Sequence, residues 1–177
     1  MLQQNCGMND TFESSSVLHV VRPARESDLA AIVGMIAELA EFEQLSHLVE
    51  VSVDKLRPHL FGARPVAEAM VAESSVDGEL HAFALYFHNF STFLAKPGLY
   101  LEDLYVQPAW RGAGLGQMLL KQLAALAVER GCGRFEWSVL DWNSKAIAFY
   151  ERMGAQVLPD WRICRVTGAE LEALAGA

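Results

Sequence analysis

Residues 99–117 read LYLEDLYVQPAWRGAGLGQ, and this stretch decides the architecture of the chain. An apolar run with two adjacent carboxylates meets Pro108, and three glycines (Gly112, Gly114 and Gly116) precede an amphipathic segment. A glycine-rich turn between a strand and a helix exposes unpaired N–H groups at the positive end of the helix dipole. Glycine also lets an anion approach the backbone without interference from a Cβ atom. The stretch therefore predicts a turn that binds a pyrophosphate.

Two other glycine-rich phosphate sites do not match this turn. A Walker loop ends in Gly-Lys followed by Ser or Thr, whereas Gly116 is followed by Gln117. A dinucleotide fingerprint needs a glycine at position 117 and an acidic residue about 20 residues later, where Cys132 and Gly133 stand. The pattern that remains is Arg-x-x-Gly-x-Gly at residues 111–116.

With its flanking segments, this pattern resembles the GNAT superfamily of acetyl-CoA-dependent N-acetyltransferases. The flanks are LEDLYV at residues 101–106, VLDWN at residues 139–143 and AFYERMGA at residues 148–155. Together they are similar to the spermidine/spermine and thialysine acetyltransferase branch, over roughly residues 20–174. The resemblance implies a single α/β domain with a mixed, twisted sheet whose central strands splay apart. It also implies acetyl-CoA as co-substrate, a small amine as acceptor and direct attack in a ternary complex.

Length and composition agree with one globular domain. The chain has 177 residues, of which 52% are hydrophobic and 20% charged, and a formal net charge of −8. An acidic chain argues against a nucleic-acid partner and attracts cationic small molecules. We expect the acetyltransferase domain at residues 17–177. The polar residues 1–16 are expected to form a disordered leader that lacks the features of a signal peptide.

Cysteine and histidine usage predicts neither disulfides nor a metal site. Cys6, Cys132 and Cys164 are odd in number and scattered, which is typical of reduced thiols in a cytoplasmic protein. The five histidines show no metal-ligand spacing and are interpreted as structural or surface residues. No apolar run approaches the roughly 18 residues of a membrane span, so we expect no membrane partner.

Hydrophobic periodicity and turn signals predict the order βααβββαβαβ, followed by a short helix. The expected helices lie at residues 29–43, 53–60, 115–130, 143–153 and 169–174. The expected strands lie at residues 17–21, 67–72, 80–87, 99–106, 135–140 and 162–166, and residues 89–98 form a loop.

The resemblance also implies which residues hold the cofactor. A bulged strand would offer its backbone to the acetyl and pantetheine groups at Leu104, Tyr105 and Val106. The pyrophosphate would lie on the turn formed by Arg111, Gly112, Ala113, Gly114, Leu115, Gly116 and Gln117. Further contacts would come from a later helix, at Asn143, Ala146 and Phe149. Asn143 also stands where it can cap that helix.

Acetyl transfer needs a neutral amine, yet a lysine-like amine is neutral in only about one molecule in 10³ at pH 7. A carboxylate acting as general base lowers that barrier. Adjacent residues of a strand face opposite sides, so if Glu102 shares a face with Tyr100, Asp103 shares the other with Leu101. The resemblance aligns Glu102 with the deprotonating glutamate and makes Asp103 a cation-binding residue. From the residues alone, a solvated or salt-bridged carboxylate is the alternative.

Tyr150 is the candidate general acid. A phenol of pKa about 10 is protonated at pH 7 and can pass its proton to a thiolate of pKa about 8.5. The resemblance directs this hydroxyl at the thioester sulfur, and a core tyrosine is the alternative.

The acceptor site is implied less completely. Phe42 and Glu43 match an aromatic–acidic substrate pair, and Trp161 matches a substrate-site tryptophan. Glu136 stands where mammalian polyamine enzymes carry a substrate-contacting histidine, which leaves open a diamine, a polyamine or a thialysine-like amino acid. The relatives further imply a homodimer. Other functions left open are a CoA-binding sensor or interaction module without turnover, and an acetyltransferase for an antibiotic or a protein N-terminus.

Overall fold

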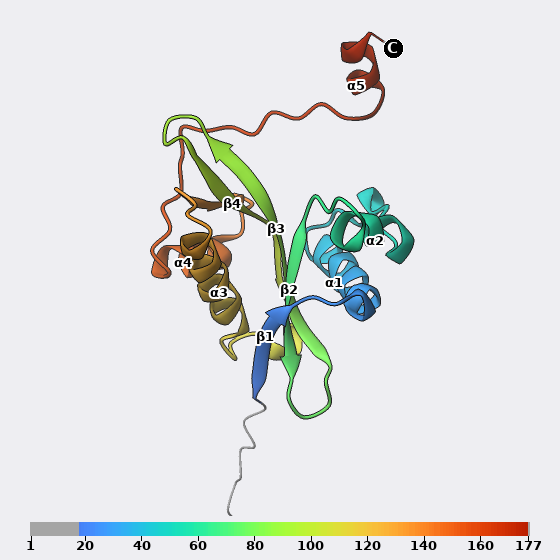
Figure 1. Ribbon diagram of the computed structural model, residues 1–177, viewed down its shortest axis with the longest axis vertical. Coiled ribbons are helices and arrows are strands. Elements are labelled where there is room, and N and C mark those ends of the chain that lie inside the picture. Colours follow the sequence, from blue (N-terminus) through green and yellow to red (C-terminus); the bar gives the residue numbers. More distant parts are fainter. Residues whose placement is uncertain (1–17, 177) are drawn as a thin grey trace, which may run out of the picture. The chain divides into compact units, whose positions relative to one another are not determined.

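A five-stranded sheet with strand order β1-β2-β3-β4-β5 organises the first part of the molecule (Figure 1). The computed structural model describes residues 18–176, so the expected leader lies outside the described residues. The chain divides into two units, one ending at Ser138 and the other beginning at Val139, and each is described by itself. The strands are β1 (His19–Pro23), β2 (Glu68–Ser74), β3 (Leu80–Ser91), β4 (Lys96–Val106) and β5 (Phe135–Trp137).

The sheet is mixed, as predicted. Strands β1 to β4 pair antiparallel, and β5 pairs parallel to β4. The hairpin of β3 and β4 is longer than predicted, because the expected loop at residues 89–98 continues the ladder through pairs such as Asn89 with Gly98. Strand β5 is shorter than predicted: it ends at Trp137, whereas the predicted strand spans residues 135–140.

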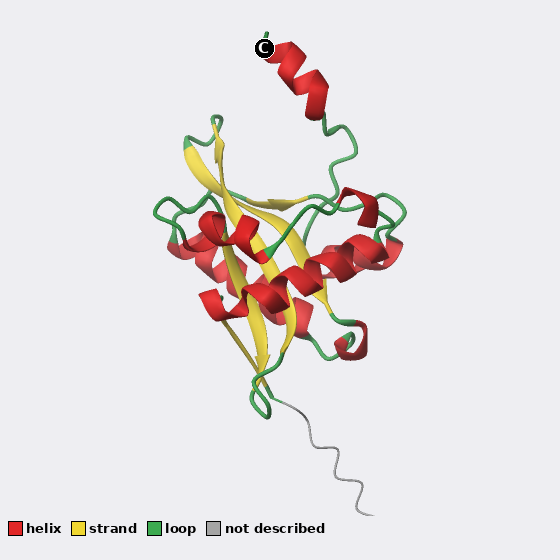
Figure 2. Cartoon of the chain, turned by 90° about the vertical axis from the view of Figure 1, so that its right-hand side faces the viewer, coloured by secondary structure: helices red, strands yellow, loops and turns green. Residues whose placement is uncertain are grey.

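Helices cover both faces of the sheet, with α1 (Leu29–Phe42) and α2 (Val53–Phe61) on one side and α3 (Leu115–Glu129) on the other (Figures 1 and 2). Short 3-10 helices lie at η1 (Glu26–Asp28), η2 (Ser46–Leu48) and η3 (Pro108–Trp110). Apolar residues at helical spacing bury one face of each long helix. They include Leu29, Ile32 and Met35 of α1, and Leu119, Leu120 and Leu123 of α3.

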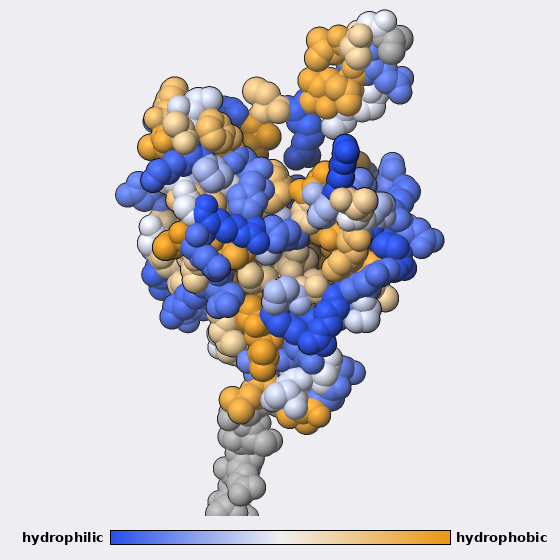
Figure 3. Space-filling model, viewed as in Figure 1, coloured by the Kyte–Doolittle hydropathy of each residue, from blue (hydrophilic) through white to orange (hydrophobic). Residues whose placement is uncertain are grey.

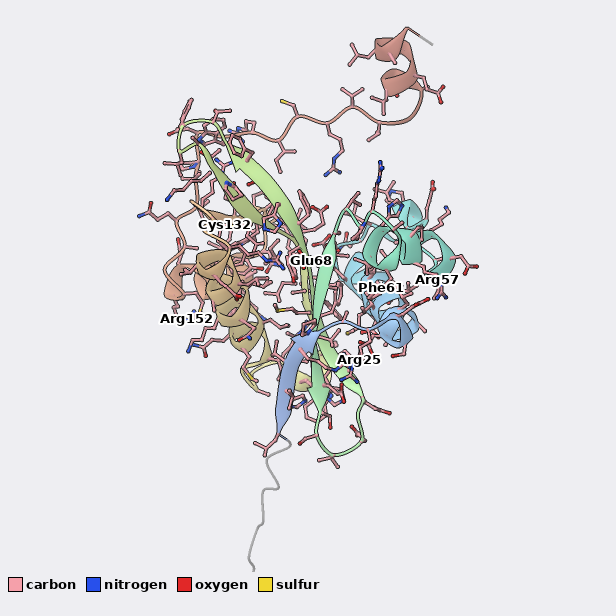
Figure 4. The ribbon with its side chains drawn as sticks, in the orientation of Figure 1. Arg25, Arg57, Phe61, Glu68, Cys132 and Arg152 are labelled. Atoms are coloured by element: carbon pink, nitrogen blue, oxygen red, sulfur yellow. The ribbon has the colours of Figure 1, made fainter. Side chains whose placement is uncertain are left out.

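Ion pairs tie the helices to the strands. Glu68 of β2, labelled in Figure 4, accepts from Arg130 directly after α3, with 2.8 Å between Oε2 and Nη2. Arg22 of β1 binds both Asp28 of η1 and Glu73 of β2. The first contact holds the end of α3 against β2. The second holds the start of α1 against β1 and β2.

The second unit contains α4 (Ser144–Arg152) and α5 (Gly168–Ala175). The predicted strand at residues 162–166 is wrong, because these residues are exposed and pair with no strand among the described residues. A strand is stabilised by its neighbour, and an alternating sequence without one does not form a ladder. Apolar side chains on α5 are exposed, and they show as orange at the top of Figure 3.

Two bulges shift the register of the sheet. Between β2 and β3 the additional residue is His81, and between β3 and β4 it is Glu102. The second bulge overturns the expectation that Leu101 and Asp103 share a face. Leu101 pairs with Tyr86 and Asp103 with Leu85, which are adjacent residues of β3 and face opposite sides.

We expect Gly98→Ala to destabilise the protein by about 1–2 kcal/mol, because an added Cβ would lie 2.2 Å from Asn89 Oδ1. Asn89 cannot move freely, since its Nδ2 donates to Glu136 over 2.9 Å. The matched control is Gly34→Ala in α1, where nothing lies within 4 Å of the added Cβ. Alanine is the better helix former, so this variant should gain up to about 1 kcal/mol. Urea unfolding would measure both, and equal effects would contradict the prediction.

Candidate active site

The turn after η3 has the geometry that an anion site requires. Gly112 and Gly114 adopt φ values of +85° and +87°, in the left-handed region, and no atom lies within 4 Å of an added Cβ at either position. The first hydrogen bond into α3 runs from Met118 N to Gly114 O at 3.0 Å. The N–H groups of residues 115–117 therefore have no partner within the helix and lie at its positive end.

The edge of β4 next to this turn is open. Strand β5 pairs with β4 only at residues 99–101, whereas β4 continues to Val106. Gln107 N donates to His81 O at 3.0 Å, which makes Ala82 and Val106 a non-hydrogen-bonded pair. The N–H and C=O of Val106, and those of Leu104 two residues earlier, consequently point away from β3. Beyond Leu101, β4 has no partner on the β5 side among the described residues, which agrees with the splayed central strands that the resemblance implied.

Tyr105 lies differently from its neighbours. By the same alternation its backbone faces Phe83 on β3, so it does not offer hydrogen bonds at the open edge. Its side chain is buried in the core under α1, and its hydroxyl donates to Glu38 Oε2 at 3.0 Å. Of the three strand residues implied to hold the cofactor, the geometry thus favours Leu104 and Val106.

Arg111 connects the turn to the end of α1. Its Nε donates to Val106 O at 3.0 Å. Its guanidinium carbon lies 5.2 Å from the ring centre of Phe42 and 5.6 Å from that of Tyr105. Cations over aromatic faces are attracted by the ring quadrupole. The side chain of Arg111 therefore lies against Phe42, the aromatic member of the predicted pair.

A cavity of about 270 Å³ lies beside this point, between α1, the segment at residues 45–51 and β4. Its walls are mostly apolar, formed by Ile36, Leu39, Ala40, Leu45, Leu48, Val49 and Val51. Three carboxylates complete the lining, those of Glu43, Glu50 and Asp103. Asp103 reaches the cavity because the bulge at Glu102 turns it to the face that α1 covers.

Two of these carboxylates, Glu43 and Asp103, are electrostatically strained, whereas Glu50 is exposed and lies 3.4 Å from Lys55 Nζ. Burial raises the pKa of Glu43. Burial also raises the pKa of Asp103 to about 6, and the negative charges of Glu102 and Glu43 add to that shift. Desolvation and like charges both disfavour the ionised form, and a bound cation would relieve both. An apolar cavity with carboxylates suits an aliphatic chain that carries an ammonium group.

Sequence reading did not find Glu50 or the wall at residues 45–51. The available signal was an acidic residue inside the mostly apolar segment LSHLVEV, directly after the predicted pair Phe42–Glu43. Such a segment reads as an ordinary loop until the fold places it over Asp103.

Glu136 of β5 has structural partners. Its Oε2 lies 2.7 Å from Arg134 Nε and accepts from Asn89 Nδ2 at 2.9 Å. Glu136 is therefore salt-bridged, and it is not among the residues that line the cavity.

The remaining predicted residues belong to the second unit. Asn143 Oδ1 accepts from Ala146 N at 3.2 Å, which confirms that Asn143 caps α4. Tyr150 lies half-buried on α4 with its ring centre 5.3 Å from that of Phe149. Trp161 is 77% exposed.

Within residues 18–176, no group of three or more His, Cys, Asp and Glu side chains is arranged to hold a metal ion. Over the same residues, every helix is too short or too polar to cross a bilayer. Cys132 and Cys164 are free thiols.

We expect Asp103→Asn to stabilise the protein more at pH 8 than at pH 5. A carboxyl whose pKa is raised on folding adds stability below its unfolded pKa of about 3.9, and that stability is lost as the pH rises through about 6. Asparagine does not ionise, so the variant escapes this loss. The difference in free energy of unfolding between variant and wild type should be on the order of 1 kcal/mol more favourable to the variant at pH 8 than at pH 5. Urea unfolding at the two pH values measures it, and a pH-independent difference would contradict it.

Comparisons with known proteins identify the family of this chain. Residues 36–155 match the Acetyltransferase (GNAT) family. The chain is 42% identical to thialysine N-epsilon-acetyltransferase of Mus musculus over 165 residues, which cover 88% of this chain and 96% of the relative. It is 33% identical to L-ornithine N5-acetyltransferase of Arabidopsis thaliana over 197 residues, which cover 87% of this chain and 86% of the relative.

Solved structures share the fold. An integron cassette protein from the mobile metagenome of V. cholerae superposes with a TM-score of 0.75 at 24% identity, over 90% of this chain and 98% of that one. Ribosomal-protein-alanine N-acetyltransferase of Brucella melitensis superposes with a TM-score of 0.68 at 21% sequence identity. The superposition covers 85% of this chain and 99% of that one. With the match over residues 36–155 and relatives above 30% identity along most of its length, the chain belongs to the GNAT family of acetyltransferases.

Proposed function

We propose that this protein transfers the acetyl group of acetyl-CoA to the primary amine of a small cationic acceptor, by direct attack in a ternary complex. The acceptor is a diamine, a polyamine or a thialysine-like amino acid. The observation that carries this proposal is the cavity that combines apolar walls with the carboxylates of Glu43, Glu50 and Asp103.

Acetyl-CoA would be held by two features of the first unit. Its pyrophosphate suits the unpaired N–H groups at the start of α3, where Gly112 and Gly114 keep the approach clear. Its pantetheine amides suit the backbone groups of Leu104 and Val106, which lie on the open edge of β4 and can pair as an added strand would. From the second unit, Ala146 and Phe149 of α4 are further candidates for cofactor contacts.

The acceptor would extend its methylene groups along the apolar wall and place an ammonium group between Glu43 and Asp103. Both carboxylates have raised pKa values in the free protein, so a cation between them relieves repulsion as well as gaining attraction. The relatives named for thialysine and L-ornithine act on amines at the end of short aliphatic chains. Phe42, next to Glu43, would supply an aromatic surface.

The chemistry needs three proton transfers. Glu102 takes a proton from the bound ammonium, the neutral nitrogen attacks the thioester carbonyl, and the carbon–sulfur bond breaks. Tyr150 then protonates the departing thiolate, and the second proton that the nitrogen loses as the amide forms restores the hydroxyl of Tyr150. In this proposal the two adjacent carboxylates have different roles. Asp103 lines the cavity and binds the cation, whereas its chain neighbour Glu102 is exposed and acts as the base.

We also propose a cytoplasmic homodimer. Trp161 and Ile163 after α4, and Leu171 and Leu174 of α5, are each more than half exposed. Burying such side chains against a second copy would gain about 25 cal/mol per Å² of apolar area. Sedimentation of a monomer at micromolar concentration would overturn this part of the proposal.

An acceptor panel tests the activity. Thiol release from acetyl-CoA should be fast with thialysine, lysine, ornithine, putrescine or spermidine, and slow with a neutral aromatic amine, an aminoglycoside antibiotic or a peptide N-terminus. The control is Gly114→Val, which places a branched side chain at a left-handed glycine where the anion approaches, and which should abolish acetyl-CoA binding with an unchanged circular dichroism spectrum. Tight binding of acetyl-CoA without turnover of any amine would favour a sensor instead.

Tyr150→Phe separates catalysis from packing. If the hydroxyl protonates the thiolate, kcat should fall on the order of 10- to 10³-fold while acetyl-CoA affinity and Tm stay close to wild type. If the hydroxyl only stabilises the fold, the variant should lose about 1 kcal/mol of stability and keep its kcat. Steady-state kinetics and a melting curve on this one variant decide the role.

A further inference from the structure

Two histidines and a tryptophan form a cluster at the entry to the glycine turn. His19 of β1 and His81 of β3 share a hydrogen bond of 2.8 Å between Nε2 and Nδ1. The imidazole of His81 stacks on the indole of Trp110, with 4.0 Å between ring centres and 14° between planes. The ring of His19 meets the same indole edge-on at 5.0 Å. Sequence reading gave these histidines no role beyond structure.

The sheet brings these residues together by a specific distortion. Strand β2 lies between β1 and β3, so the two imidazoles meet across it. His81 is the additional residue of the bulge between β2 and β3, and its side chain is only 4% exposed. A bulge re-aims a side chain out of the regular alternation, and it commonly lies next to a functional site.

The cluster is also continuous with the turn. Gln107 N donates to His81 O at 3.0 Å, Trp110 N donates to Gln107 O at 2.9 Å, and Ala113 N donates to Trp110 O at 3.3 Å. Backbone hydrogen bonds thus lead from the bulge to the residue between Gly112 and Gly114. A Cβ added at either glycine would meet no described atom within 4 Å, so nothing packs against that side of the turn, and its position depends on how the chain enters and leaves it.

The exit of the turn is fixed independently. Leu115, the first residue of α3, is 2% exposed and belongs to the buried face of that helix. The entry is held by Trp110. Of its described ring contacts, the stacked His81 has the shortest distance between ring centres. Burial and the neighbouring His19 lower the pKa of His81, which favours the neutral ring that the hydrogen bond between the two imidazoles needs.

We propose that Trp110, held by His81 and His19, positions the anion-binding turn and thereby sets the affinity for acetyl-CoA. Trp110 acts through the backbone of residues 111–114 and is a positioning residue. The inference rests on the proposed function and extends it to residues that are not part of the acceptor cavity lining.

The experiment compares Trp110→Ala with Trp110→Phe in the full chain. Loss of the stack should raise both the Kd for CoA, measured by calorimetry, and the KM for acetyl-CoA by about three- to tenfold, which is the range that one stacked aromatic pair supplies. The kcat at saturation and the KM for the amine should stay within about threefold of wild type. Phenylalanine keeps an aromatic face against His81, so Trp110→Phe should recover most of the affinity.

The matched control is Phe87→Ala, which removes a half-buried aromatic side chain from another part of β3, where it packs on Tyr100 with ring centres 5.1 Å apart. It should lower Tm as much as Trp110→Ala does, but leave the Kd for CoA unchanged. A Trp110→Ala variant that loses Tm but binds CoA as wild type does would overturn the inference. Wild-type protein that fails to bind CoA would instead overturn the proposed function.

Discussion

The one-residue bulge at Glu102 is the constraint on which the site depends. Without it, Asp103 would lie on the same face as Leu101, away from α1 and the cavity. With it, Asp103 turns toward α1 and the cavity, and β4 keeps an apolar face toward α3. The same irregularity occurs just where β5 stops pairing, so one distortion accompanies both the acidic cavity and the open edge.

Much of this fold could be predicted from local signals. The glycine turn and the buried faces of α1 and α3 follow from spacing and residue type, because those features depend on neighbours within a few positions. The splayed and bulged strand was implied by the resemblance alone. Neither the position of its bulge at Glu102 nor the bulge at His81 could be predicted, since an additional residue is defined only against its partner strand. The predicted strand at residues 162–166 failed because no partner strand pairs with it among the described residues.

The candidate site divides in the same way. Glu43 and Asp103 were identified separately from the resemblance, and the lining of the cavity contains both of them. Glu50 and the cluster of His81 with Trp110 were not identified, because their importance arises from packing between segments far apart in the chain. Glu136 illustrates a third case, in which a plausible acidic residue is bound by an arginine two positions away, a contact that a strand permits on one face.

The raised pKa of Asp103 has a thermodynamic consequence for ligand binding. Near pH 6 this carboxyl holds its proton in about half of the free molecules, and a cation bound beside it would expel that proton into the solvent. Acceptor binding is then a proton-releasing reaction. Its measured enthalpy will depend on the ionisation enthalpy of the buffer, and its apparent affinity will increase with pH until the carboxyl is fully ionised in the free protein.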